Sequence, residues 1–240
     1  MNTGNKINRG CWLILLLLTL GACQSNREQE AAAPSILRLN KHDQERSAES
    51  IKVVDGSPYQ NGDIIFHSSQ SSQSMAIQIV TNSPYSHVGI LYQEKGQWYV
   101  YEAISTVQAT PLKQWIARGK NQHYVVKRLK NTGLLTPKTL QKMKEVGQQF
   151  QGKAYDLKFE WSNEKMYCSE LVWKIYDQGL GIELGKLEQI KDFNLTTPLV
   201  QQKIKERYGQ SLPLEQWVIS PAQIFDCSKL ETVFESATEL

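Results

Sequence analysis

Cys168 heads a stretch of the sequence whose residue types could support thiol chemistry. Apolar residues follow it at Leu171, Val172, Ile175 and Tyr176, the spacing of one buried helix face. We therefore expect Cys168 to lie in the first turn of a partly buried helix. Unpaired backbone N–H groups and the positive end of the helix dipole favour a thiolate there over a thiol. The simpler alternative is that Cys168 is a small buried apolar residue, which is the commonest role of a free cysteine.

A cysteine nucleophile needs a base, and the base needs a group that orients it. His87 lies near the start of a predicted strand at 86–92, and residues 94–97 have the composition of a hairpin turn. The return strand at 98–103 then brings Glu102 toward His87, because an antiparallel pair places late residues beside early ones. A carboxylate at a facing position can accept the second imidazole N–H. Either residue alone is as easily a solvated strand-end residue, and it is their pairing in one hairpin that favours a catalytic role.

Other kinds of site find little support in the sequence. It contains no His-Glu-x-x-His stretch, no paired Cys-x-x-Cys, no Gly-x-Ser-x-Gly elbow and no glycine-rich phosphate loop. We therefore predict neither a metal nor a cofactor. The remaining histidines lie in a polar N-terminal stretch or at strand ends, and they are His42, His67 and His123.

Residues 1–22 resemble a bacterial export signal. Lys6 and Arg9 form a positive start, and residues 12–18 form an apolar run that is short for a bilayer span. Small residues then precede Cys23, an ending that resembles a lipobox, in which the cysteine is lipidated and becomes the mature N-terminus. The alternative is an ordinary signal peptide with a chance cysteine.

The residue after the expected lipidation site is Gln24 rather than an aspartate. In a Gram-negative cell the resemblance implies an outer-membrane anchor with the body facing the periplasm, and in a Gram-positive cell an anchor on the outer face of the plasma membrane. Residues 23–50 are polar and carry no sustained apolar period, so we expect them to tether the body to the membrane. We place the folded domain at 51–228 and a loose tail at 229–240.

Export also changes the charge and the set of cysteines. Loss of the signal removes two of the 27 Lys and Arg residues and none of the 24 Asp and Glu residues, which leaves a net charge of +1. Such a chain lacks the basic footprint of a nucleic-acid-binding protein. Cys11 leaves with the signal, whereas Cys168 and Cys227 remain. In an oxidising compartment these two could pair, which would remove the nucleophile.

The domain has the pattern of helices flanking a small antiparallel sheet, so we predict the α+β class. Apolar runs between turn signals predict strands at 63–67, 86–92, 98–103 and 122–128. Apolar periodicity and capping residues predict helices at 75–80 after Ser74, at 137–151 after Thr136, from Cys168 onward, at 198–208 and at 220–225. The segment 68–74 is expected to be a loop.

Five short motifs occur in a fixed order along this domain: Gly62–Phe66, Ser86–Ile90, Tyr101–Ala103, Gly152–Asp156 and Tyr167–Leu171. Together they resemble the permuted papain-like amidase family, the YiiX/YebB-like branch of the NlpC-type cysteine peptidases. In ordinary papain-like enzymes the cysteine precedes the histidine, whereas in this family the order is reversed, as it is here. The resemblance covers roughly Tyr59 to Phe225 and implies a circularly permuted NlpC-type fold.

The resemblance also implies roles for the residues singled out above. Cys168 would be the nucleophile, His87 the base and Glu102 the orienting acid. Tyr155 and Tyr167 are candidate substrate-binding residues, although both are as readily packing aromatics. The implied activity is hydrolysis, through a thioester, of amide bonds in cell-wall peptides or lipid-linked amides. Two alternatives stay open, an acyltransferase on the same fold and a non-catalytic envelope lipoprotein that binds such a ligand. The sequence does not predict the oligomeric state.

Overall fold

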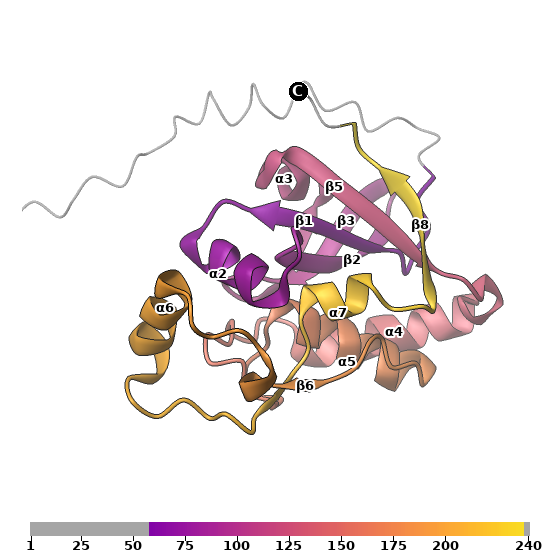
Figure 1. Cartoon of the computed structure of the whole chain (residues 1–240). Helices are drawn as coiled ribbons and strands as arrows, with labels where there is room; N and C mark the ends of the chain where they lie inside the picture. Colours follow the sequence, from indigo (N-terminus) through magenta and orange to yellow (C-terminus); the bar gives the residue numbers. More distant parts are fainter. Residues whose placement is uncertain (1–57, 238–240) are drawn as a thin grey trace, which may run out of the picture. The chain divides into compact units, whose positions relative to one another are not determined.

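A six-stranded antiparallel sheet lies at the centre of the part of the chain that this computed structural model describes, residues 58–237 (Figure 1). The strands follow the order β4 (Val107–Pro111), β3 (Gln97–Ala103), β2 (His87–Glu94), β1 (Ile64–Ser69), β5 (Gly119–Leu129) and β8 (Leu230–Glu235). The α-helices are α2 (Ser72–Thr81), α3 (Leu112–Ala117), α4 (Pro137–Phe150), α5 (Cys168–Leu180), α6 (Pro198–Tyr208) and α7 (Pro221–Phe225). Two short strands, β6 (Glu188–Gln189) and β7 (Trp217–Val218), pair with each other, and the 3₁₀ turns are η1 (Thr132–Leu134) and η2 (Ile190–Asp192).

Helices cover both faces of the sheet. Along β1, Ile64 and Phe66 enter a larger core that includes residues of α4, α5 and α7, while Ile65 enters a smaller core that contains Trp115 of α3. Successive side chains of a strand point to opposite faces, so a run of adjacent apolar residues needs both covers. Figure 1 shows α3 on one side of the sheet and α4, α5 and α7 on the other. The predicted α+β class is confirmed.

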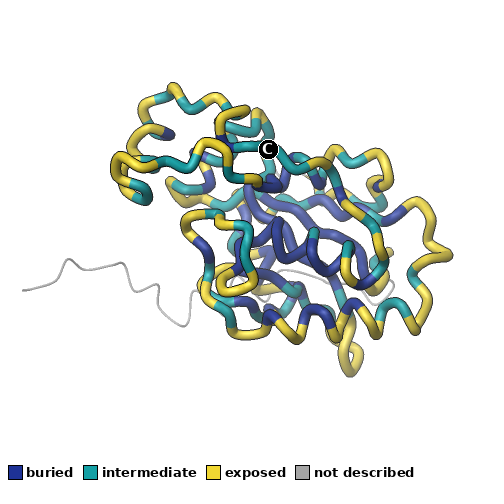
Figure 2. Tube along the Cα trace, turned by 90° about the horizontal axis from the view of Figure 1, so that it is seen from below, coloured by how far each residue is buried: buried dark blue, intermediate teal, exposed yellow. Residues whose placement is uncertain are grey.

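The helix that carries Cys168, α5, is deeply buried. The residues of its predicted apolar face, Leu171, Val172, Ile175 and Tyr176, are at most 3% exposed. The helix packs against α4 and against strands β2 and β3. Figure 2 shows the buried segments gathered inside the fold, with exposed loops around them. The first turn of α5 is therefore held firmly against the end of the sheet.

Two predicted helix caps are confirmed and one is wrong. Thr136 and Ser220 each accept a hydrogen bond from the backbone N–H three residues later. At α2 the cap is Ser71 rather than Ser74, so the helix begins inside the segment that we expected to be a loop. Ser74 is buried instead, and its hydroxyl hydrogen-bonds that of Ser86. This contact ties α2 to the start of β2.

Among the α-helices and the strands of the six-stranded sheet, three elements escape prediction from the sequence pattern. Strand β4 has five residues and helix α3 has six, which is too short for a periodicity to be recognised. Strand β8 lies in the segment 229–240, where we expected a loose tail. Leu230–Glu235 instead pairs antiparallel with β5 at the edge of the sheet. The predicted domain end at 228 is therefore corrected, because the sheet extends to Glu235.

The expected signal, the lipidation site Cys23 and the tether lie outside the described residues. Within 58–237, no helix has both the length and the apolar character that a membrane crossing requires.

Gly89 on β2 lies at a point of very close packing. A Cβ atom at this position would lie 2.4 Å from Cγ1 of Val100 and 2.9 Å from the carbonyl oxygen of Tyr101. We expect Gly89→Ala to lower the free energy of unfolding by about 1–3 kcal/mol, the usual cost of overpacking a core. Chemical denaturation measures this loss. Gly133→Ala, in an exposed turn, is the matched control, and an equal loss in both variants would contradict the packing argument.

Candidate active site

The structure brings Cys168, His87 and Glu102 together where the ends of β2 and β3 meet the first turn of α5. Nε2 of His87 lies 2.6 Å from Oε2 of Glu102, and the same ring hydrogen-bonds the sulfur of Cys168. The three residues are 3%, 8% and 0% exposed, respectively. A thiol, an imidazole and a carboxylate thus form one buried hydrogen-bonded chain. This is the arrangement that nucleophilic catalysis by cysteine needs.

The contact between His87 and Glu102 runs diagonally across the hairpin. The register pairs Ile90 with Tyr101, which puts Glu102 opposite Gly89, two residues along from His87. A long side chain can reach such a diagonal neighbour. The expectation that the hairpin brings the two residues to the same end is correct, but their facing positions are displaced by two.

Two residues hold the carboxylate of Glu102 from the side away from His87. The hydroxyl of Thr110 and Nη2 of Arg118 each donate to Oε1 of Glu102 at 2.5 Å, which leaves Oε2 for the imidazole. Burial raises the pKa of Glu102, but the hydrogen bond and charge of His87, together with Arg118, outweigh it and lower that pKa to about 2. Glu102 is therefore a carboxylate throughout the ordinary pH range. Sequence reasoning missed Thr110 and Arg118, because they belong to β4 and to the C-terminal end of α3.

The thiol of Cys168 lies in an environment that favours its ionised form. Burial raises its pKa, but the hydrogen bond and charge of His87 and the backbone N–H groups of Val88 and Ser169 lower it below the ordinary value. For His87, burial favours the neutral ring, yet the contacts with Cys168 and Glu102 raise its pKa to about 9. The same contacts thus favour the thiolate of Cys168 and the imidazolium of His87. The N–H of Ser169 belongs to the first turn of α5, as expected for a cysteine at a helix start.

A second histidine, His67, packs beside His87. His67 and His87 face each other in the register of β1 and β2, and their ring centroids are 5.2 Å apart. Trp115 stacks on His67 at 3.9 Å and lies 5.8 Å from His87. Burial, followed by the charges of His87 and Arg118, lowers the pKa of His67 well below its usual value, so this ring is neutral. The paired positions of the two histidines in adjacent strands were the signal in the sequence, but Trp115 could not be placed without α3.

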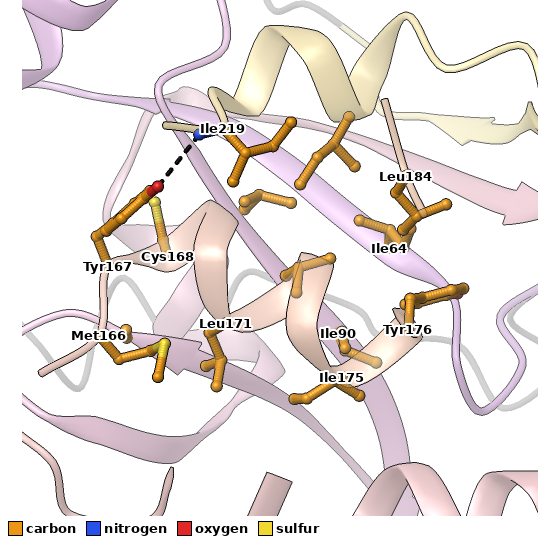
Figure 3. Packing of buried hydrophobic residues seen from close by; sticks show 14 of the residues in the cluster. Ile64, Ile90, Met166, Tyr167, Cys168, Leu171, Ile175, Tyr176, Leu184 and Ile219 are labelled. Atoms are coloured by element: carbon orange, nitrogen blue, oxygen red, sulfur yellow. Dashed lines mark hydrogen bonds between the residues drawn. The ribbon is translucent and has the colours of Figure 1, made fainter. Parts of the chain in front are cut away.

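The two tyrosines expected near the substrate lie beside Cys168. The hydroxyl of Tyr155 accepts a hydrogen bond from Nε2 of Gln73 (3.1 Å) and contacts the sulfur of Cys168. The hydroxyl of Tyr167 accepts the backbone N–H of Ile219 at 3.1 Å, as Figure 3 shows. Tyr167 is only 2% exposed, so much of its ring is a packing surface. Gln73 was missed, because it lies in the segment expected to be a loop.

Two hollows adjoin this group of residues. The first, which we call the apolar pocket, has a cavity volume of about 140 Å³ and lies between α2, α6 and the start of α5, and Cys168 lines it. The second, which we call the polar cleft, has a volume of about 600 Å³, and His87 and Arg118 line it. Tyr155 and Gln73 border both hollows. The reactive groups thus lie between an apolar space on the sulfur side and a polar space on the imidazole side.

The remaining candidate residues lie away from this group or outside the described chain. His123 contacts Glu235 at 3.3 Å near the edge of the sheet. Cys168 and Cys227 are both free thiols, so the alternative of a disulfide between them is not observed. His42 falls outside residues 58–237. Across that range, His, Cys, Asp and Glu side chains form no group of three or more that could hold a metal ion.

An antiparallel sheet whose early hairpin supplies the histidine and the acid, and whose later helix supplies the cysteine, defines a papain-like protein with permuted chain order. The comparisons agree with this class. The model of the family described as "Permuted papain-like amidase enzyme, YaeF/YiiX, C92 family" matches residues 58–234. The chain belongs to this family, which is one of papain-like cysteine hydrolases.

Two relatives illustrate the similarity. The chain is 48% identical over 174 residues to "Uncharacterized protein YiiX" of Escherichia coli (strain K12), a match that covers 72% of this chain and 85% of that protein. It also resembles a crystal structure described as "metalloprotein yiiX from Escherichia coli O157:H7", with a TM-score of 0.72 and 47% identity. That match covers 75% of this chain and 99% of the other.

Proposed function

We propose that this protein is a cysteine amidase of the cell envelope, with Cys168 as nucleophile, His87 as general acid and base, and Glu102 as the residue that orients the histidine. The observation that carries the proposal is the buried hydrogen-bonded chain from sulfur to imidazole to carboxylate. A structural ion pair has no need of hollows beside both the thiol and the imidazole, whereas an active site does. Membership of a family of papain-like amidases supports the same reading.

The first half of the reaction forms a thioester. The Cys168 thiolate attacks the carbonyl carbon of an amide, and the electron pair of the C=O bond moves to oxygen. When the tetrahedral intermediate collapses, the C–N bond breaks and the imidazolium of His87 gives its proton to the leaving amine. Glu102, ionised throughout, keeps the ring oriented and stabilises its charged form.

We assign two donors to the stabilisation of the oxygen of the intermediate. The backbone N–H of Cys168 belongs to the first turn of α5, where N–H groups lack helical partners. The hydroxyl of Tyr155 contacts the sulfur, and burial raises its pKa well above the usual value, so it stays protonated and able to donate. Preorganised donors of this kind stabilise developing negative charge.

The second half of the reaction returns the free enzyme. Neutral His87 takes a proton from a water molecule, whose oxygen attacks the thioester carbon. The C–S bond breaks, the carboxylic acid leaves, and the sulfur departs as the thiolate beside the newly formed imidazolium.

The N-terminal sequence supports an envelope location. Residues 1–22 have the features of an export signal, and Cys23 follows them in a lipobox-like context. We propose that the lipid on Cys23 anchors the protein and that residues 24–50 separate the domain from the membrane. Mass analysis of the N-terminal peptide from membrane fractions tests this anchor.

A relative is described as a metalloprotein, but the residues present here do not fit a metal. Within 58–237 no suitable group of ligands exists, and His87 is already engaged by both Glu102 and Cys168. The proposed reaction therefore includes no metal step.

Alkylation of Cys168 tests the charge state on which the mechanism depends. Because the pKa of Cys168 is lowered, iodoacetamide should label it rapidly at pH 7, and labelling should slow only as the pH falls below that lowered value. His87→Ala removes the contact that lowers the pKa, so burial then raises it, and we expect labelling at pH 7 to slow by at least about 10-fold. For amide hydrolysis, kcat/KM should also fall above about pH 9, where His87 loses the proton that the leaving amine needs.

His123→Ala is the matched control, since its ring lies at the sheet edge beside Glu235. Peptide mapping separates label on Cys168 from label on Cys227. If wild-type Cys168 reacts only at the alkaline pH of an ordinary thiol, the proposed ion pair is wrong.

A further inference from the structure

The apolar pocket is built from elements far apart in the sequence. Helix α2 supplies one wall, α6 another, and the segments around residues 190–195 and 218–221 close it. Apolar residues from these segments include Ala76, Val80, Phe193, Val200, Ile204 and Val218. Cys168, the residue proposed as nucleophile, also lines it. An apolar hollow beside a reactive side chain is typical of a ligand site.

Three hydroxyl groups at the wall of the apolar pocket already have hydrogen-bond partners within the protein. Ser169 donates to the carbonyl oxygen of Ile219 at 2.7 Å, and the hydroxyl of Ser220 caps α7. Tyr167 accepts the N–H of Ile219. A peptide lying in this space would bring an amide N–H and C=O with every residue, and leaving them unpaired is costly. The chemistry of the wall therefore favours a hydrocarbon chain over a peptide.

The cations of α6 at the pocket are also engaged. Nζ of Lys203 lies 2.6 Å from Glu206, and the guanidinium of Arg207 lies over the ring of Phe159 at 5.2 Å. Both cations thus have a partner within the protein.

The positions of the two hollows set the direction of a substrate. A carbonyl attacked by Cys168 remains bonded to the sulfur as the acyl group, so that half of the substrate belongs on the sulfur side. The leaving amine must lie within hydrogen-bond reach of His87, which gives it a proton. The sulfur borders the apolar pocket, whereas His87 borders the polar cleft with Arg118, Ser86 and Ser105.

We propose that the apolar pocket binds the aliphatic acyl chain of an N-acyl amide, and that the polar amine half of the same substrate lies in the polar cleft. This inference rests on the proposed function and narrows its substrate from any amide to a fatty acyl amide of a polar amine. The thioester formed on Cys168 then carries the hydrocarbon chain between α2 and α6, and the amine departs on the side of His87.

Alkylation by two chloromethyl ketones tests the pocket without requiring turnover. Chloroacetone and 1-chlorodecan-2-one present the same reactive carbon, and the sulfur displaces chloride from each as a C–S bond forms. The longer reagent carries seven additional methylenes on the acyl side of its carbonyl. Each fully buried methylene favours binding by about fourfold, so we expect Cys168 to react on the order of 100-fold faster with the longer reagent even if only about half of them are buried.

Matched variants on α6 locate the effect. Ile204 lines the pocket, whereas the next residue, Lys205, is exposed to solvent. Ile204→Trp fills the pocket and should reduce the rate ratio of the two reagents by at least about 10-fold, while Lys205→Trp should leave the ratio at its wild-type value. Ala76→Phe narrows the pocket from α2 and should act as Ile204→Trp does. Thermal unfolding and the rate with chloroacetone report whether each variant is folded.

The outcomes separate the two proposals. If Cys168 reacts rapidly with chloroacetone but the chain length has no effect, or if Ile204→Trp and Lys205→Trp behave alike, the acyl pocket is wrong and the amidase proposal stands. If Cys168 reacts with neither reagent at neutral pH, the amidase proposal is wrong, and the acyl pocket, which rests on it, is wrong as well.

Two amide substrates with ten-carbon chains on opposite sides of the amide bond test the direction. N-decanoylethanolamine carries its hydrocarbon on the acyl side, and N-decylacetamide carries it on the amine side. We expect the first to be cleaved at least about 100-fold faster, with decanoate and ethanolamine detected by mass spectrometry. Faster cleavage of the second would reverse the assignment of the two hollows.

Discussion

Replacing Cys168 with alanine should lower kcat/KM for amide hydrolysis by on the order of 10⁵–10⁶-fold, the loss seen when the nucleophile of a comparable hydrolase is removed. The reason is that no other group can form the thioester. In the structure the sulfur adjoins the imidazole of His87, and Cys168 lines the apolar pocket. Product formation from N-decanoylethanolamine, followed by mass spectrometry, measures the loss.

The fold should survive this change. Cys168 is 3% exposed, and alanine removes one atom without adding bulk, so the melting temperature should move by only a few degrees. Cys227→Ala is the matched control, because Cys227 is the other free thiol of the described domain. We expect it to retain wild-type turnover. Turnover that persists in Cys168→Ala, or disappears equally in Cys227→Ala, would eliminate the proposed nucleophile.

Glu102→Gln should lower kcat/KM by roughly 10³–10⁴-fold, as loss of the orienting carboxylate does in a related triad. The amide keeps the size of the side chain but cannot hold the imidazolium, because the negative charge 2.6 Å from Nε2 of His87 is lost. Without that charge, burial lowers the pKa of His87 from about 9, and the alkaline limb of the pH profile should move to lower pH. Arg118 and Thr110 then face a neutral group, which makes some loss of stability an expected companion effect.

Another histidine–glutamate pair in the same domain provides the control for this experiment. Glu235 contacts His123 at 3.3 Å with a side chain that is 59% exposed, so Glu235→Gln makes the same chemical change at a solvated site. We expect it to leave both kcat/KM and the pH profile unchanged. A wild-type pH profile in Glu102→Gln would show that the carboxylate does not act through His87.

Patterns confined to a few consecutive residues determined much of this protein in advance. The strands around residues 63–67, 86–92 and 98–103 follow from runs of apolar residues between turn signals, and the cap Thr136 marks the start of α4. The apolar spacing after Cys168 predicted its helix, because side chains three and four residues apart share a face. One hairpin sufficed to bring His87 and Glu102 to the same end, since a short turn fixes which residues of two strands are neighbours.

What the sequence could not determine depends on contacts between distant segments. Thr110 and Arg118 hydrogen-bond Glu102 because β4 and the end of α3 bring them there. Both elements are too short for a periodic sequence pattern to be recognised. The sequence of the edge strand β8 by itself resembles that of a loose tail, and only its pairing with β5 makes it part of the sheet. The diagonal reach from Glu102 to His87 depends on the register across the hairpin.

The sequence therefore predicted the identity of the reactive groups, but it did not predict the side chains that surround them. The apolar pocket lies between α2 and α6, helices separated by more than half of the domain, and no local pattern relates their facing side chains. Local patterns arise from the fixed geometry of helices and strands, but a cavity and the pKa values beside it arise from which surfaces meet when the chain packs. That packing alone decided which side of the thiol is apolar and which is polar.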